Sequence, residues 1–186
     1  MSRLLFAYTI SVLQKGGGFF MKRLKIFTAV GGAAVLVLGT AAHFFYEWSG
    51  ENFLIGMIAP VNESTWEHMK LAFFPMLLFA AAAQIFLGKA YPGAASAALC
   101  AALLSTVLIP VLFYTYVGVL GFTVPVLNIL TFVAAVLIGV LVFFHLCKSG
   151  SAERFLPLLF AAAAAAALAF FLFTCFPPEI GLFAQP

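Results

Sequence analysis

The residues with the clearest chemical potential lie between positions 43 and 70 of this 186-residue chain. This stretch holds two of the three histidines and four of the six acidic residues. Imidazole nitrogens and carboxylate oxygens are good zinc ligands, so His43, Glu67 and His68 form a candidate metal site. An open fourth position would hold an activated water, with Glu63 or Glu67 as the catalytic general base.

Helical spacing supports this grouping. His43 and Glu47 are four residues apart and share one face of a helix, and Glu63 and Glu67 do the same further along. His68 follows Glu67 by about 100° of helical rotation. If the two helices pack antiparallel, the two histidines reach the same depth. We expect the other polar residues of the stretch to surround them: Glu47, Asn62, Ser64 and Trp66.

Helix capping is the alternative interpretation of the same residues. The segment from Ser64 to Glu67 fits a capping box, with Ser64 as the N-cap, and Asn62 could cap one turn earlier. Glu67 and Lys70 are three residues apart and can pair on the helix surface. The chain has no HExxH or HxxxH pair. In this interpretation the stretch starts a helix and carries no chemistry.

The composition shows which elements must position these residues. Hydrophobic residues make up 65% of the chain and charged residues 8%, against about 25% charged in soluble domains. The mean hydropathy is +1.17. These values exclude a soluble, disordered or nucleic-acid-binding protein and indicate a multi-pass helical membrane protein. Cys100, Cys147 and Cys175 lie far apart in apolar runs, which predicts packing rather than disulfides or metal binding.

Five apolar segments approach or exceed the roughly 20 residues that a membrane-spanning helix needs. We therefore predict an all-α transmembrane bundle with the lipid bilayer as its surroundings. The apolar stretch Phe53 to Ala59 is too short to span and is expected to form a re-entrant or interfacial lid over the polar cluster. The predicted spans are 26–46, 71–88 with an extension to about 65, 93–120, 123–147 and 155–176.

Basic residues predict the orientation, because lysine and arginine concentrate in cytoplasmic segments. From Met21 onward, six of them precede the first span or lie in the connections 89–92 and 148–154, which fall on one side. Only Lys70 falls on the other side. The prediction is a bacterial cytoplasmic membrane protein with its N-terminus inside, and with the polar cluster and the C-terminus outside.

Residues 1–20 differ from the rest. Leu4 to Leu13 is too short to span, and Met21 is followed by Lys22-Arg23-Leu24-Lys25, typical of the start of a bacterial membrane protein. We expect residues 1–20 to be a translated leader, or alternatively a short sixth helix. Residues 21–186 are expected to form one helical domain.

Small residues predict where the helices meet, because they let helix backbones approach closely in lipid. Ala94, Ala98 and Ala102 repeat every four residues, as do Ala135 and Gly139. The uninterrupted run 161–167 is alanine throughout and is also expected to pack against a neighbouring helix. Such faces would equally serve an oligomer.

The segment from His43 to Pro75, and above all Pro60-Val-Asn-Glu-Ser-Thr-Trp-Glu-His-Met-Lys70, resembles an uncharacterised family of small bacterial multi-pass membrane proteins. The resemblance runs from Met21 to about Phe176 and implies no known activity. Asn62-Glu63-Ser64 with Trp66 and His68 is also similar to a stretch of progestin/adiponectin-receptor-type proteins, which belong to a group of multi-span metal hydrolases. The spacing is shorter here and the downstream HxxxH is missing, so this similarity favours a metal site but transfers no residue.

Three functions are compatible with these observations. The first is an outward-facing zinc site, with metal-dependent hydrolysis as its chemistry. The second is a transport component that binds a small-molecule or lipid ligand, since small alanine-rich membrane proteins include vitamin-uptake subunits. The third is a structural or assembly protein without chemistry. Metal analysis of the purified protein separates the first from the other two.

Overall fold

The computed structural model describes the backbone of residues 2–185 and the side chains of residues 18–185, and this part of the chain contains helices and no strand. Five helices are long and apolar enough to cross a membrane. The prediction of an all-α bundle with five spans is therefore confirmed, with helix ends within a few residues of those expected except at the start of the first helix, which was predicted at residue 26. The helices are α1 (Ser2–Trp48), α3 (Thr65–Leu87), α4 (Ala94–Leu120), α5 (Pro125–Ser149) and α6 (Leu156–Cys175).

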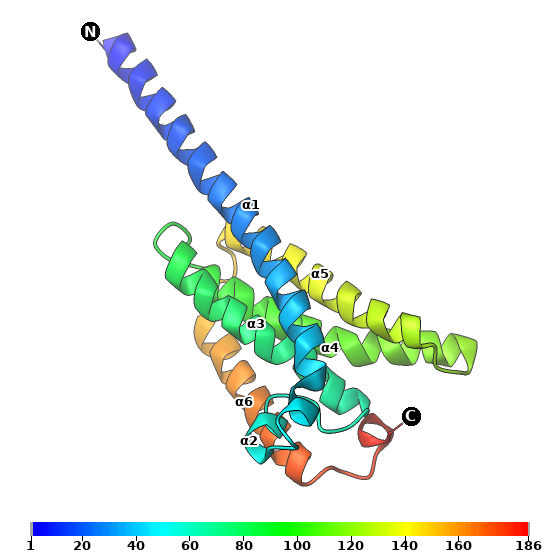
Figure 1. Cartoon of the computed structure of the whole chain (residues 1–186). Helices are drawn as coiled ribbons and strands as arrows, with labels where there is room; N and C mark the ends of the chain where they lie inside the picture. Colours follow the sequence, from blue (N-terminus) through cyan, green and yellow to red (C-terminus); the bar gives the residue numbers. More distant parts are fainter. Residues whose placement is uncertain (1, 186) are drawn as a thin grey trace.

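Helix α1 is continuous from Ser2 to Trp48, and it runs through the three glycines at positions 16–18 without a break. Its first turns extend well beyond the rest of the bundle, as the blue end of the ribbon in Figure 1 shows. The membrane-length apolar part begins at Gly18. The separate leader and the Met21 start remain predictions.

Helices α3, α4 and α5 form the centre of the bundle, with α3 packed along α4 and α4 along α5. Helix α1 crosses α3 and α5, and α6 lies against α4 (Figure 1). Small residues allow this close packing, as expected: Ala98 and Ala102 of α4 and Ala135 of α5 are fully buried. A side chain at Gly139 of α5 would overlap the Ser105 hydroxyl of α4.

The alanine run of α6 behaves differently from the expectation. Ala163 is its only buried member, and most of the others are exposed within this chain. Helix α6 is instead held by larger side chains, because the buried Phe170 packs against Trp66, Phe73 and Phe74 of α3. Aromatic contacts of this kind stabilise the packing of two helices through the large apolar area that they bury and through the preferred geometry of the ring pairs.

The stretch after α1 turns back over the end of the bundle. Its apolar part forms the one-turn helix α2 (Phe53–Gly56), which begins at Asn52, whose side chain accepts a hydrogen bond from Leu54 N. The chain then leads to α3 through a connection in which Ala59 is fully buried. Two short 3-10 helices, η1 (Glu153–Phe155) and η2 (Gly181–Phe183), flank α6. The predicted non-spanning lid is therefore a short helix and a buried turn.

Candidate metal centre

His43 reaches the centre because α1 approaches α3 very closely one turn before it. A Cβ atom at Gly39 would lie 2.5 Å from the backbone oxygen of Leu71 and 2.5 Å from the ring of Phe132. Only glycine fits this crossing without a shift. His43 lies four residues after Gly39, so it shares the face of α1 that is turned toward α3.

His68 reaches the centre from the first turn of α3. Ser64 is the N-cap, and its hydroxyl accepts a hydrogen bond from Glu67 N at 3.4 Å, so the predicted cap is the observed one. Asn62 supports the turn before the helix, because its side chain accepts from Ser64 N at 2.9 Å. Glu63 therefore precedes the helix, and the backbone of the connection between α2 and α3 determines where its carboxylate points.

His43, Glu63 and His68 come together at this point. One carboxylate oxygen of Glu63, Oε2, lies 3.4 Å from His68 Nε2 and 3.7 Å from His43 Nε2. The two imidazole rings have their centroids 5.3 Å apart. One ligand atom from each residue lies within 4.8 Å of the other two. A single oxygen thus faces two imidazole nitrogens from two different helices.

The hydrogen bond at Nδ1 of the His68 ring indicates whether Nε2 is free to accept or to bind a metal ion. Nδ1 lies 2.9 Å from the Ser64 carbonyl oxygen, which only accepts, so Nδ1 carries the proton. In the neutral ring Nε2 then presents a lone pair to the Glu63 carboxylate. Two acceptors this close are favourable only with a donor or a cation beside both of them, and a metal ion and a bridging water each meet this requirement. His145 makes the same contact with Leu141, at 2.8 Å, so this bond orients a ring without by itself marking a site.

The distances are longer than direct hydrogen bonds and allow a shared metal ion. An N–H···O bond measures about 2.7–3.2 Å between heavy atoms, and both histidine–glutamate separations are longer. Ligand atoms bound to a tetrahedral zinc at about 2.0–2.1 Å lie about 3.3–3.4 Å from one another. The observed 3.4 and 3.7 Å are close to that value. The third separation, between the ligand atoms of the two histidines, is within 4.8 Å.

The site has room for a further ligand. The Glu63 side chain is 62% exposed, and those of His43 and His68 are 34% and 29% exposed, so solvent reaches the group. On the inner side, Glu63 and His68 line a cavity of about 80 Å³ closed by α4 and α5. Polar side chains of α5, Asn128 and Thr131, also line this cavity.

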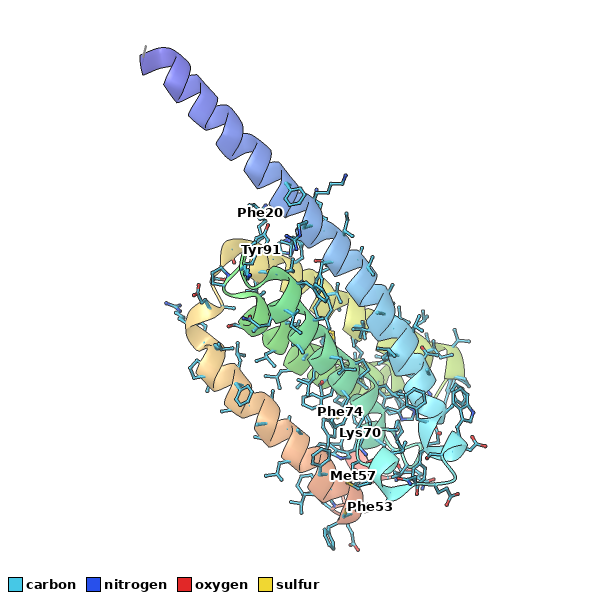
Figure 2. The ribbon with its side chains drawn as sticks, turned by 60° about the vertical axis from the view of Figure 1, so that its left-hand side comes forward. Phe20, Phe53, Met57, Lys70, Phe74 and Tyr91 are labelled. Atoms are coloured by element: carbon cyan, nitrogen blue, oxygen red, sulfur yellow. The ribbon has the colours of Figure 1, made fainter. Side chains whose placement is uncertain are left out.

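Glu67 lies outside the histidine group in which the metal-site hypothesis placed it, and it pairs with Lys70, as the alternative interpretation predicted. Its Oε2 accepts from Lys70 Nζ at 2.6 Å and from Val61 N at 3.0 Å, and its Oε1 lies 3.0 Å from the Thr174 hydroxyl of α6. The Glu67 side chain is 2% exposed and that of Lys70 is fully buried. Figure 2 shows Lys70 between α3, α6 and the lid. Glu63 takes the place beside the histidines that was expected for Glu67.

The lid covers this ion pair. Lys70 Nζ donates to the carbonyl oxygens of Gly56 at 2.8 Å and Ala59 at 3.4 Å, at the end of α2 and in the turn after it. The Thr174 hydroxyl, 2.7 Å away, also accepts from Lys70. The ammonium group is therefore satisfied by the lid, α3 and α6 together. Thr174 carries no sequence signal for this role, because it lies 107 positions from Glu67.

Glu47 and Trp66, which were also expected around the histidines, lie outside the centre. Glu47 is exposed at the end of α1 and lies outside the group that His43, Glu63 and His68 form. Trp66 faces the opposite side of α3, where its ring packs against Phe170 of α6 and Phe183 of η2. Gly39 was missed by sequence reasoning, although a small residue one turn before His43 is a signal for close helix packing.

These features define a helical protein of membrane-spanning type with a histidine–glutamate group at one end of its bundle. The chain belongs to the family of unknown function DUF6512, which matches residues 20–186. The expected membership of an uncharacterised family is thereby confirmed. Searches of curated proteins and of solved structures found no match. The family carries no assigned activity, so the function of the chain depends on the chemistry of its own site.

Proposed function

We propose that the protein binds a zinc ion through His43, Glu63 and His68. The observation that carries this proposal is the single oxygen, Glu63 Oε2, that faces the Nε2 atoms of both histidines at near-ligand spacing. Two histidines and one glutamate are the protein ligands of several hydrolytic zinc enzymes. The bond from His68 Nδ1 to Ser64 O is of the kind that orients metal-bound histidines.

The fourth position of such a centre faces solvent and the small cavity beside Glu63 and His68. Zinc with three protein ligands and an open position lowers the pKa of a bound water and supports hydrolysis. In this arrangement Glu63 is a ligand, and Glu67 is held by Lys70. Neither glutamate then acts as the general base expected from the sequence, so we propose a hydrolytic type of centre and assign no base.

Elemental analysis of the detergent-purified protein tests the proposal. We expect about one zinc per chain, lost in His43→Ala and in His68→Ala and kept in His145→Ala. His145 is the matched control because its ring makes the same helical contact outside the cluster. Iron in place of zinc would support the proposed ligands but not the proposed metal, since two histidines and a carboxylate also bind Fe(II). Wild-type protein that takes up neither metal when titrated would refute the proposal.

The open position has its own test. Cobalt-substituted protein should show the visible absorption of a four-coordinate centre, and added azide should shift that spectrum by replacing the exchangeable ligand. An absorption spectrum unaffected by azide would indicate a closed, structural centre and would exclude the hydrolytic type.

A further inference from the structure

A second feature, independent of the metal centre, is a groove between α1 and α3 on the outside of the bundle. It encloses about 580 Å³ between apolar side chains of the two helices. Val30 on α1 and Leu78 and Phe86 on α3 line it, and each is more than half exposed. Its length follows α1 from Arg23 to Leu38.

One end of this groove is basic. Arg23 and Phe86 line both the groove and an adjoining pocket of about 330 Å³ that also contains Lys89. The apolar groove therefore continues into a notch with two exposed cations. Figure 2 shows Phe20, which lines this notch, and Tyr91, in the connection after α3, at the same end of the bundle.

Arg23 is held in position at this junction. Its guanidinium donates to the backbone oxygen of Phe86 at 3.1 Å, in the last turn of α3. This bond uses one of the five N–H donors of an arginine side chain. The planar guanidinium can offer further donors to a phosphate, which it recognises with two parallel hydrogen bonds.

We propose that this groove binds an anionic phospholipid, with the headgroup phosphate at Arg23 and Lys89 and an acyl chain between α1 and α3. The groove follows α1 for about 22 Å, whereas one leaflet contributes about 15 Å of hydrocarbon, so the groove is long enough to hold an acyl chain of that leaflet. A phospholipid supplies both the apolar chain and the negative charge, whereas an apolar helix from another copy would leave both cations without counter-charge. Anionic lipids are enriched on the side where the sequence places this end.

Native mass spectrometry of the full chain in detergent, with dioleoylphosphatidylglycerol or dioleoylphosphatidylcholine added, tests this proposal. Wild-type protein should retain the anionic lipid in preference to the zwitterionic one. The double variant Arg23→Gln/Lys89→Gln should lower phosphatidylglycerol binding by about tenfold or more and leave phosphatidylcholine unchanged. Lys89→Gln alone keeps the bond between Arg23 and Phe86 and should show a smaller loss in the same direction.

Two controls separate this site from general charge attraction. Lys148→Gln/Arg154→Gln removes two charges at the same end of the bundle, outside the groove and its notch, and should leave binding of both lipids unchanged. Ala34→Phe fills the groove, keeps the charges and should weaken both lipids. Equal losses in the two charge variants, no preference for phosphatidylglycerol, or a lipid-free dimer would overturn the proposal.

Discussion

The rings of His43 and His68 lie with their centroids 5.3 Å apart, and each follows by one turn the contact that positions its helix. For His43 that contact is the crossing at Gly39, where α1 meets the backbone of α3. For His68 it is the N-cap at Ser64, which begins α3. Backbone packing and helix capping therefore determine the distance between the two imidazoles, and this distance does not depend on a long flexible loop.

The first prediction concerns this crossing. Gly39→Ala places a methyl group against the Leu71 carbonyl and the Phe132 ring, so the helices must separate. We expect a loss of about 1–3 kcal/mol in unfolding free energy and weaker zinc binding. Gly118→Ala is the matched control, because a Cβ there meets nothing within 4 Å. Calorimetric zinc titration and thermal unfolding in detergent measure both effects, and equal behaviour of the two variants would contradict the prediction.

The second prediction separates two glutamates at the same end of the bundle. Glu63→Ala removes a proposed ligand, whereas Glu47→Ala removes an exposed carboxylate outside the group. Loss of an outer-shell partner costs about 10–100-fold in metal affinity, so loss of a ligand should exceed about 100-fold. Glu47→Ala should change the affinity little. Both variants remove one negative charge at this end of the bundle. Similar affinities of the two variants for zinc would therefore mean that Glu63 contributes only its charge and is not a ligand.

The third prediction concerns the buried ion pair. Lys70→Met leaves the Glu67 carboxylate buried without its cation and should cost about 3–5 kcal/mol. The double variant Glu67→Gln/Lys70→Met removes both charges and should recover much of that loss. A double-mutant cycle from unfolding in detergent gives the coupling, and additive effects would contradict a specific pair. Zinc binding should survive in the double variant because Glu67 is not a ligand.

The fourth prediction tests the start of α3. Ser64→Ala removes the acceptor for Glu67 N and should cost about 1 kcal/mol. Asn62→Ala removes a bond that precedes the helix and should cost less. Thermal unfolding of both variants in detergent provides the comparison. The opposite order would place the effective cap at Asn62.

The fifth prediction concerns orientation. In a variant that lacks the three native cysteines, Ser49→Cys should react with an impermeant maleimide added to intact cells, and Ser151→Cys should react only after lysis. Both serines are exposed at opposite ends of the bundle, so access to the reagent depends on the membrane side. Removal of the native cysteines matters because Cys175 is exposed near the same end as Ser49. The reverse pattern would invert the predicted topology.

Local patterns made much of the fold predictable. Each span is a long apolar run, and in lipid such a run satisfies its backbone hydrogen bonds only as a helix. Short connections then require antiparallel neighbours. The cap at Ser64 depends on residues within one turn, and the buried Ala98, Ala102 and Ala135 depend on a four-residue repeat of small side chains. These features are predictable because the interacting groups are near one another along the chain.

The sequence by itself determined that histidines and glutamates gather at one end of a helical bundle, but only the tertiary structure decided which glutamate faces them. Helical spacing placed Glu63 and Glu67 on one face, whereas α3 begins after Glu63, so the two carboxylates point independently. Lys70, the lid and Thr174 of α6 then hold Glu67, while the crossing at Gly39 brings His43 to Glu63. The partners of each glutamate depend on contacts between distant segments. A carboxylate in an apolar bundle pairs with the cations and donors that helix packing places beside it.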